Sequence, residues 1–183
     1  MLVIGYGALG ACAAIEAYDN GSIVLIIEKM AQPGGNTAIS SGGFMVPQDG
    51  PTALKYLTAT YDLANSEKDD ELLNTFCKEI MGVKEWTTGL KDGTELWVYG
   101  HAGFQNLPGW EVIDKHRVRG KKRSGDCLFD LYRYAVEEKR NIPVMLETPA
   151  VQLIQKDGQV VGAFASNNGK NINIKANKAV VLT

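Results

Sequence analysis

The sequence predicts an α/β fold of three layers, in which a parallel β-sheet carries helices on one face and an antiparallel β-meander on the other. Three observations lead to this prediction. A short apolar strand, a Gly-rich turn and an Ala-rich helix open the chain, and a continuously apolar strand follows over 22–27. Short segments of alternating polarity over 144–176 indicate the meander. The last six residues, 178–183, again read as a buried parallel strand.

Composition and charge narrow the class of protein. The 183 residues are 45% hydrophobic and 22% charged, with a net charge of -2, which is typical of a soluble globular domain and offers no field to attract nucleic acid or an anionic membrane. Cys12, Cys77 and Cys127 lie far apart without a Cys-x-x-Cys pair, so we expect neither disulfides nor a metal site. The apolar run 1–4 is too short for a membrane span or a signal segment, and we therefore expect a cytoplasmic protein.

The first βαβ unit is predicted from the residues that mark the ends of its strands and helix. Residues 2–4 form a strand, residues 9–20 form a helix, and Gly21 supplies the residue after its C-terminal cap. The strand over 22–27 then ends in Glu28.

The turn inside this unit has the pattern of a diphosphate-binding loop. In such a loop Gly5 would make the tight turn, Gly7 would let the backbone approach a pyrophosphate, and Gly10 would let helix and strand pack closely. Glu28, eighteen residues after Gly10, can accept hydrogen bonds from a ribose diol, and its charge disfavours a 2′-phosphate. Because strand, helix and acid agree, the pattern predicts a dinucleotide site rather than a structural Gly-rich turn.

The segment Gly34–Gly43 follows Glu28 by a few residues, where an NAD-binding unit would run into its next helix. Its glycines permit backbone contact with a long ligand, and its Asn, Thr and Ser side chains offer short donors and acceptors. This segment favours FAD over NAD.

The remaining elements are predicted from periodicity. An apolar stripe of Leu54, Leu57, Tyr61 and Ala64 predicts one helix, and a second stripe over 72–86 predicts another behind a Ser66-x-x-Asp69 start signal. Residues 89–125 read as loops and short strands, and 125–140 as a helix. Two-residue hairpin turns are predicted at the pairs Asp157-Gly158 and Asn168-Gly169.

The pieces G-Y-G-A-L-G at 5–10, E-K at 28–29 and G-G-N-T-x-x-S-S-G-G at 34–43 resemble the FAD-binding domain of the fumarate reductase and succinate dehydrogenase flavoprotein family. That family includes urocanate reductases and 3-ketosteroid dehydrogenases. The resemblance implies a Rossmann-like, three-layer FAD-binding domain over 1–183, with the dinucleotide-binding unit and flavin loop in 1–45 and the meander in 144–176. It implies contacts to FAD from Gly5, Gly7, Leu9, Gly10, Glu28, Lys29, Gly35, Asn36, Thr37, Ser41, Gly42, Gly43, Ala150 and Val151.

The resemblance also implies an activity. Members of the family are FAD-dependent oxidoreductases that reduce or desaturate a carbon–carbon double bond next to a carbonyl or carboxylate. A small substrate, such as an unsaturated acid or a ketosteroid-like compound, and an electron-donor protein or domain are therefore expected partners. The family's catalytic acid lies largely in a capping domain and a later stretch, which would follow Thr183, so the chain is expected to be the incomplete, N-terminal portion of a longer flavoenzyme, and no catalytic residue is assigned.

Alternatives remain at this point. The chain can be a non-catalytic nucleotide-binding module or a truncated fragment that needs a partner chain, and an NAD-linked dehydrogenase explains the first unit but not Gly34–Gly43. Tyr99 falls roughly where ketosteroid dehydrogenases place an active-site tyrosine, although a packing role is favoured. His101 and His116 are interpreted as solvated or hydrogen-bonded loop residues, and the basic run 115–123 as a solvated loop.

Overall fold

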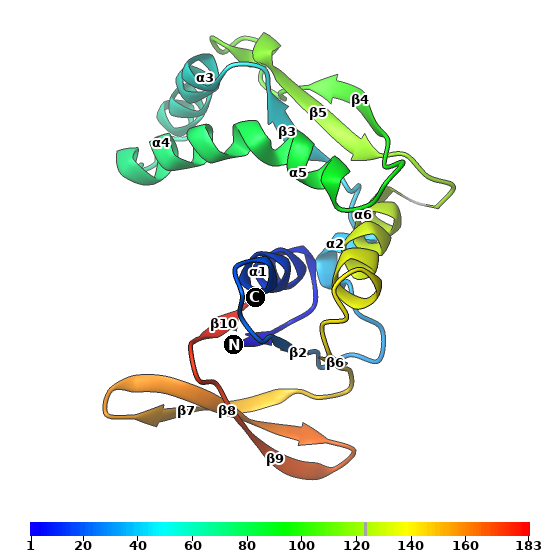
Figure 1. The fold of residues 1–183 in the computed structure, drawn as a ribbon. Coiled ribbons are helices and arrows are strands. Elements are labelled where there is room, and N and C mark those ends of the chain that lie inside the picture. The colour runs from blue at the N-terminus through cyan, green and yellow to red at the C-terminus, as the bar shows by residue number, and fades with distance from the viewer. Residues whose placement is uncertain (123) are drawn as a thin grey trace. The chain divides into compact units, whose positions relative to one another are not determined.

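The computed structural model describes residues 1–122 and 124–183 and divides into two compact units (Figure 1). The first unit consists of residues 1–41 and 125–183, and the second of residues 42–124. Arg123, the last residue of the predicted basic run, lies outside the described residues.

A parallel sheet forms the centre of the first unit. Its strands lie in the order β10 (Val180–Leu182), β1 (Leu2–Ile4), β2 (Leu25–Ile27) and β6 (Val144–Met145). Two details differ from the sequence prediction. Strand β2 begins at Leu25, since Ile23 is exposed before it. Strand β6 pairs in parallel with β2 instead of belonging to the meander, and the helix before it supplies the long connection that a parallel pair requires.

Helix α1 (Ala8–Asp19) contacts the strands β1, β2 and β10. It buries Ala11, Ala14 and Ile15, and two of these side chains are small enough to let helix and sheet approach closely. The helix ends at Asn20, and Gly21 follows with a φ of 74°, which is the left-handed conformation predicted for that glycine.

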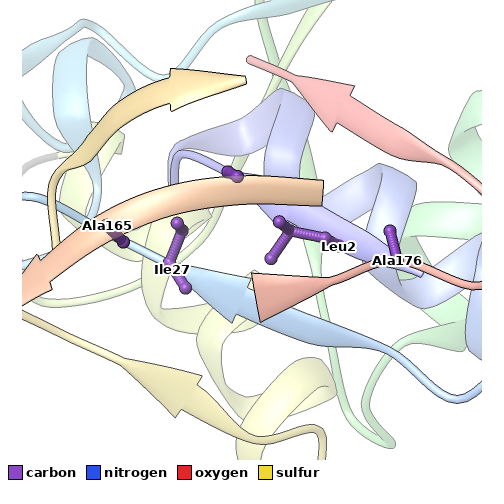
Figure 2. Packing of buried hydrophobic residues seen from close by; sticks show 5 residues of the cluster. Leu2, Ile27, Ala165 and Ala176 are labelled. Atoms are coloured by element: carbon purple, nitrogen blue, oxygen red, sulfur yellow. The ribbon is translucent and has the colours of Figure 1, made fainter. Parts of the chain in front are cut away.

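The antiparallel meander is formed by β7 (Ala150–Lys156), β8 (Gln159–Asn167) and β9 (Lys170–Lys175). Figure 2 shows its packing on the sheet, where Leu2 and Ile27 of the sheet form a buried cluster with Ala163, Ala165 and Ala176. The three-layer fold predicted from the sequence is therefore confirmed.

Both predicted hairpin turns are present in the meander. Asp157 and Gly158 have φ angles of 51° and 77°, and Asn168 and Gly169 have φ angles of 51° and 74°. Positive φ at both central residues is the type I′ geometry that matches the twist of the flanking strands.

Two further helices complete the first unit: α2 (Gly35–Ile39) and α6 (Ser124–Arg133), which continues into the π-helical turn η3 (Tyr134–Glu138). Where the turn ends, Arg140 forms a bidentate ion pair with Asp19 at the end of α1, with N–O distances of 2.8 and 2.6 Å. This pair joins the crossover helix to α1.

The second unit has a sheet of its own, which the sequence anticipated only as loops and short strands. The antiparallel strands lie in the order β3 (Phe44–Pro47), β5 (Ile113–Val118) and β4 (Leu96–His101). Its helical elements are α3 (Gly50–Leu63), α4 (Asp70–Glu79), η1 (Ile80–Gly82), α5 (Val83–Gly89) and η2 (Trp110–Val112).

Two helix predictions in this unit need correction. Helix α4 is capped by Asp69, whose carboxylate accepts the N–H of Leu72, so the start signal lies three residues after the predicted Ser66. Helix α3 buries Ala53 and Tyr56 against Ala102 and Ile113, while Tyr61 and Ala64 of the predicted stripe are exposed. Leu57 of the predicted stripe packs against this cluster, so the stripe is only partly right.

Candidate dinucleotide site

The three glycines of the turn between β1 and α1 meet different surroundings. Gly5 has a φ of 108° and donates its N–H to the carbonyl of Ile27 at 2.9 Å. A Cβ on Gly10 would overlap the carbonyl oxygen of Gly5. Gly7 is extended, and a Cβ there would find no atom nearer than the carbonyl oxygen of Gly34 at 3.7 Å. The fold therefore requires glycine at positions 5 and 10, whereas the side-chain direction at Gly7 is open to a ligand.

The N-terminus of α1 carries hydrogen-bond donors. The N–H of Ala8 donates to the Thr37 hydroxyl oxygen at 3.0 Å, which ties the loop of α2 to the helix. The N–H groups of Leu9 and Gly10 have no carbonyl within the helix to which they could donate. Together with the positive end of the helix dipole, these groups form a site suited to an anionic phosphate.

Glu28 is fixed at the end of β2 and is 7% exposed. One carboxylate oxygen accepts the N–H of Tyr6 at 2.8 Å, and the other accepts the N–H of Met30 at 2.8 Å. A carboxylate offers about four lone-pair positions, so two remain for a ligand such as a ribose diol.

Tyr6, which sequence reasoning did not single out, is fully buried beneath the turn. Its hydroxyl donates to Glu137 at 3.1 Å, and its ring meets the ring of Phe129 edge-on at 5.3 Å. Burial, reinforced by the Glu137 carboxylate, holds the pKa of the Tyr6 phenol far above its usual range, so it stays a proton donor. No sequence signal joins residues that lie 131 positions apart.

Thr148 connects the meander to the turn. It is fully buried, and its N–H donates to the Glu28 carbonyl at 2.8 Å. Its hydroxyl donates to the Leu146 carbonyl at 2.7 Å and accepts from the Asn167 amide at 2.6 Å. Two residues later β7 begins with a register shift at Val151, whose side chain is 70% exposed. An irregular, exposed strand start of this kind leaves backbone within reach of a ligand.

These segments enclose a cavity of about 490 Å³. It is lined by residues 4–9 and 27–29 and by Asn36, Thr37, Thr148, Pro149, Ala150 and Thr183. The structure thus brings together eight residues of the predicted set: Gly5, Gly7, Leu9, Glu28, Lys29, Asn36, Thr37 and Ala150. Gly10, Gly35 and Val151 belong to the first unit but not to the cavity lining, Ser41 ends the first segment of that unit, and Gly42 and Gly43 belong to the second unit.

The prediction that His101 and His116 are loop residues is wrong, because both lie on strands. His101 on β4 approaches the Asp114 carboxylate on β5 with an N–O distance of 3.0 Å. His116 on β5 is buried, its Nδ1 has no hydrogen-bond partner, and its ring stacks near Phe44. Burial lowers the pKa of His116, with Asp114 opposing and Lys84 adding to the effect.

The comparison with known proteins follows this geometry. A family model described as the FAD binding domain matches residues 1–183, so the chain belongs to the family of FAD-binding domains. Its cofactor is FAD. The open space at Gly7 and the free donors at the start of α1 agree with the diphosphate of that cofactor.

The curated relatives are larger oxidoreductases. Urocanate reductase of Eggerthella lenta is 30% identical over 194 residues, which cover this whole chain and 30% of the relative. NADH:fumarate oxidoreductase of Klebsiella pneumoniae is 27% identical over 195 residues, covering the whole chain and 20% of the relative. The chain thus spans between a fifth and a third of the length of these relatives.

Two solved structures are similar to the fold. A 3-ketosteroid Δ1-dehydrogenase from Sterolibacterium denitrificans has a TM-score of 0.87 at 19% identity, covering 99% of this chain and 46% of that one. The open conformation of a flavocytochrome c3 fumarate reductase has a TM-score of 0.81 at 26% identity, covering 99% of this chain and 32% of that one. Among the described residues, none of the helices has the length and apolar character needed to cross a membrane.

Proposed function

We propose that the chain supplies the FAD site of an oxidoreductase that reduces or desaturates a carbon–carbon double bond next to a carboxylate or carbonyl. The observation that carries this proposal is a set of three hydrogen bonds around the cavity. The N–H of Ala8 donates to Thr37, and the N–H groups of Tyr6 and Thr148 both donate to Glu28. These bonds bring three segments distant in sequence around one space lined by the residues that a dinucleotide needs.

Each part of the site receives a role in this proposal. The N–H groups of Leu9 and Gly10 hold the pyrophosphate, and the backbone of Gly7 lies beside it. Glu28 accepts the ribose hydroxyls. The backbone at Ala150 and Val151 contacts the adenine. The remaining contacts are proposed for Lys29, Gly35, Asn36, Thr37, Ser41, Gly42 and Gly43.

The bound flavin supplies hydride transfer, and the residues of this chain hold and orient it. The names of the relatives support the substrate class. Urocanate reductase and fumarate oxidoreductase are named for unsaturated acids, and we propose a substrate of that kind. The resemblance in fold to a 3-ketosteroid dehydrogenase supports a ketosteroid-like substrate as the alternative. An electron-donor protein or domain completes the proposed system.

Titration of the purified chain with FAD, followed by flavin fluorescence and by absorbance near 450 nm, tests the proposal. We expect saturable binding that ADP displaces, because the cavity holds the ADP half of the cofactor. The Gly7→Val variant should lose this binding, whereas Gly82→Ala, at an exposed position where a Cβ meets no atom within 4 Å, should keep it.

Turnover separates the proposed enzyme from a non-catalytic nucleotide-binding module. Bleaching of the bound oxidised flavin by a saturated carboxylate, or return of the 450 nm band when an unsaturated carboxylate oxidises the bound reduced flavin, supports the enzyme. Tight FAD binding with no redox exchange by either class of substrate would favour the module. Binding of NAD without binding of FAD would favour an NAD-linked dehydrogenase instead.

A further inference from the structure

One residue of the predicted basic run has an arrangement unlike that of a solvated loop. Arg117 lies on β5 directly opposite Trp97 on β4. Its guanidinium carbon lies 3.8 Å from the ring centre of Tyr99 and 5.9 Å from that of Trp97. The two aromatic rings meet edge-on at 6.0 Å. The side chain is therefore held by stacking on one face of the second unit's sheet.

The charge of Arg117 is not neutralised by the protein. Within residues 1–122 and 124–183 no carboxylate forms an ion pair with it, and its Nε is buried without a hydrogen-bond partner. Two acids close to Arg117 in the sheet pairing are already paired, since Asp114 on β5 contacts His101 and Glu95, just before β4, contacts Arg119. A stacked ring attracts the cation but offers no lone pair in the guanidinium plane. The Nε itself is covered by protein, so an acceptor from outside the chain would meet the guanidinium at its terminal Nη groups, and leaving this charged group without any acceptor is costly.

We propose that Arg117 binds the carboxylate of a flat, unsaturated or aromatic acid. A guanidinium presents paired N–H donors that match the two oxygens of a carboxylate in its plane, while its faces remain available for stacking. Trp97, which is 36% exposed, provides an apolar wall beside that position. The anion site follows from these contacts alone, whereas its use as the substrate site rests on the proposed function.

The position of Tyr99 also supports a built site. Its hydroxyl lies against Gly43, where a Cβ would overlap the phenol oxygen. The ring is thus confined between the backbone of Gly43 on one side and the Arg117 guanidinium on its face. A ring confined in this way fixes the direction of the guanidinium and lowers the cost of ordering it around an anion.

NMR of the complete 183-residue chain without added FAD tests the anion site directly. The Nε–H signal of Arg117 is assigned by its absence from the spectrum of Arg117→Lys. It is then followed during titration with cinnamate, and cinnamyl alcohol serves as the uncharged control. We expect cinnamate to shift this signal saturably and to quench the fluorescence of Trp97, and the alcohol to leave the signal unchanged. An unmoved signal at saturating cinnamate, or binding of inorganic phosphate without binding of cinnamate, would overturn the proposal.

Matched variants separate binding from packing. Arg117→Gln should weaken cinnamate binding by about tenfold or more, because both charge and paired donors are lost. Arg119→Gln, which removes a surface arginine paired with Glu95, should bind cinnamate as the wild type does. Should Arg117→Gln fail to fold, Arg117→Lys keeps the charge and must still bind more weakly.

The same samples distinguish this proposal from the proposed function. FAD titration of the wild type and of Arg117→Gln should give similar affinities, because Arg117 neither lines the dinucleotide cavity nor belongs to the proposed cofactor contacts. Cinnamate binding in a chain that does not bind FAD would refute the proposed function and leave the anion site standing. Equal loss of cinnamate binding in Arg117→Gln and Arg119→Gln would refute the anion site alone.

Discussion

The substitutions Gly10→Ala and Gly7→Ala should have different consequences: the first should lower the stability of the fold, and the second should weaken FAD binding. At Gly10 the new methyl group would overlap the carbonyl oxygen of Gly5 and lie 3.0 Å from the Thr183 hydroxyl. A backbone carbonyl cannot rotate away, so α1 must move from β1, and overpacking of this kind costs about 1–3 kcal/mol or more. Alanine in a helix returns only about 1 kcal/mol through its higher propensity. Because the overlap is with backbone, we take the upper end of that range, about 3 kcal/mol, and expect the free energy of unfolding to fall by roughly 2 kcal/mol.

At Gly7 the chain itself can accommodate a methyl group. The φ of -97° and ψ of -161° are allowed for any residue, and the nearest atoms, the carbonyl oxygen of Gly34 and the hydroxyl of Thr37, lie 3.7 and 3.8 Å away. Loss of glycine at a helix N-cap costs no more than about 1 kcal/mol. The methyl group enters the cavity, however, and we expect the dissociation constant for FAD to rise at least about tenfold, or about 1.4 kcal/mol.

Urea unfolding without FAD and fluorescence titration with FAD measure the two effects separately. Gly82→Ala serves as the control for the substitution itself, since nothing lies within 4 Å of its Cβ position. Unchanged FAD affinity in a folded Gly7→Ala chain would refute the path proposed for the diphosphate. A Gly10→Ala chain as stable as the wild type would refute the close approach of α1 to β1.

Three further predictions concern single contacts. Thr37→Val removes the acceptor of the Ala8 N–H and should weaken FAD binding about fivefold, less than Gly7→Val, whereas Thr37→Ser should retain it in the same titration. Burial lowers the folded-state pKa of His116, so the unfolded chain binds the proton more readily than the folded chain. Urea unfolding at pH 7.5 and 5.5 should therefore show that the free energy of unfolding falls below about pH 6.5. The fall should be less steep in His116→Gln. Arg140→Ala breaks the bidentate pair with Asp19 and should lower the free energy of unfolding, measured with urea at pH 7, by about 2 kcal/mol. A loss below about 0.5 kcal/mol would show that the pair does not stabilise the fold.

Local signals explain the part of the fold that the sequence could predict. The turn glycines, the Asp157-Gly158 and Asn168-Gly169 hairpins and the end of α1 at Gly21 each depend on conformations that a few neighbouring residues determine. The first βαβ unit follows because its turn, helix and strand are consecutive. Eight of the predicted cofactor contacts gather at one cavity for the same reason, since most lie on that unit or directly after it.

Pairings between distant segments explain what the sequence could not predict. The two apolar residues Val144 and Met145 fit a meander strand as well as a parallel strand, and only their pairing with the distant β2 decides between the two. The pairing of His101 with Asp114 depends on the register of β4 and β5, and the stacking of Arg117 on Tyr99 depends on the same register. Of the run 115–123 that reads as a solvated basic loop, residues 115–118 therefore lie on β5, where Arg117 has no ion pair among the described residues, while residues 119–122 lie outside any strand.

The dinucleotide turn is held in place by Tyr6 and Thr148, whose identities the glycine motif does not specify. Tyr6 uses its backbone N–H to fix the Glu28 carboxylate and its hydroxyl to contact Glu137 in the π-helical turn η3. Thr148 fixes the carbonyl of the same Glu28 from the meander. Both carboxylate oxygens of Glu28 are thus oriented by the protein itself, so the ribose contact proposed for this acid would spend little binding free energy on ordering it. The turn, the crossover helix and the meander are therefore connected through one acidic side chain and its neighbours, and we expect the affinity for FAD to depend on the crossover helix and the meander as well as on the glycines of the turn.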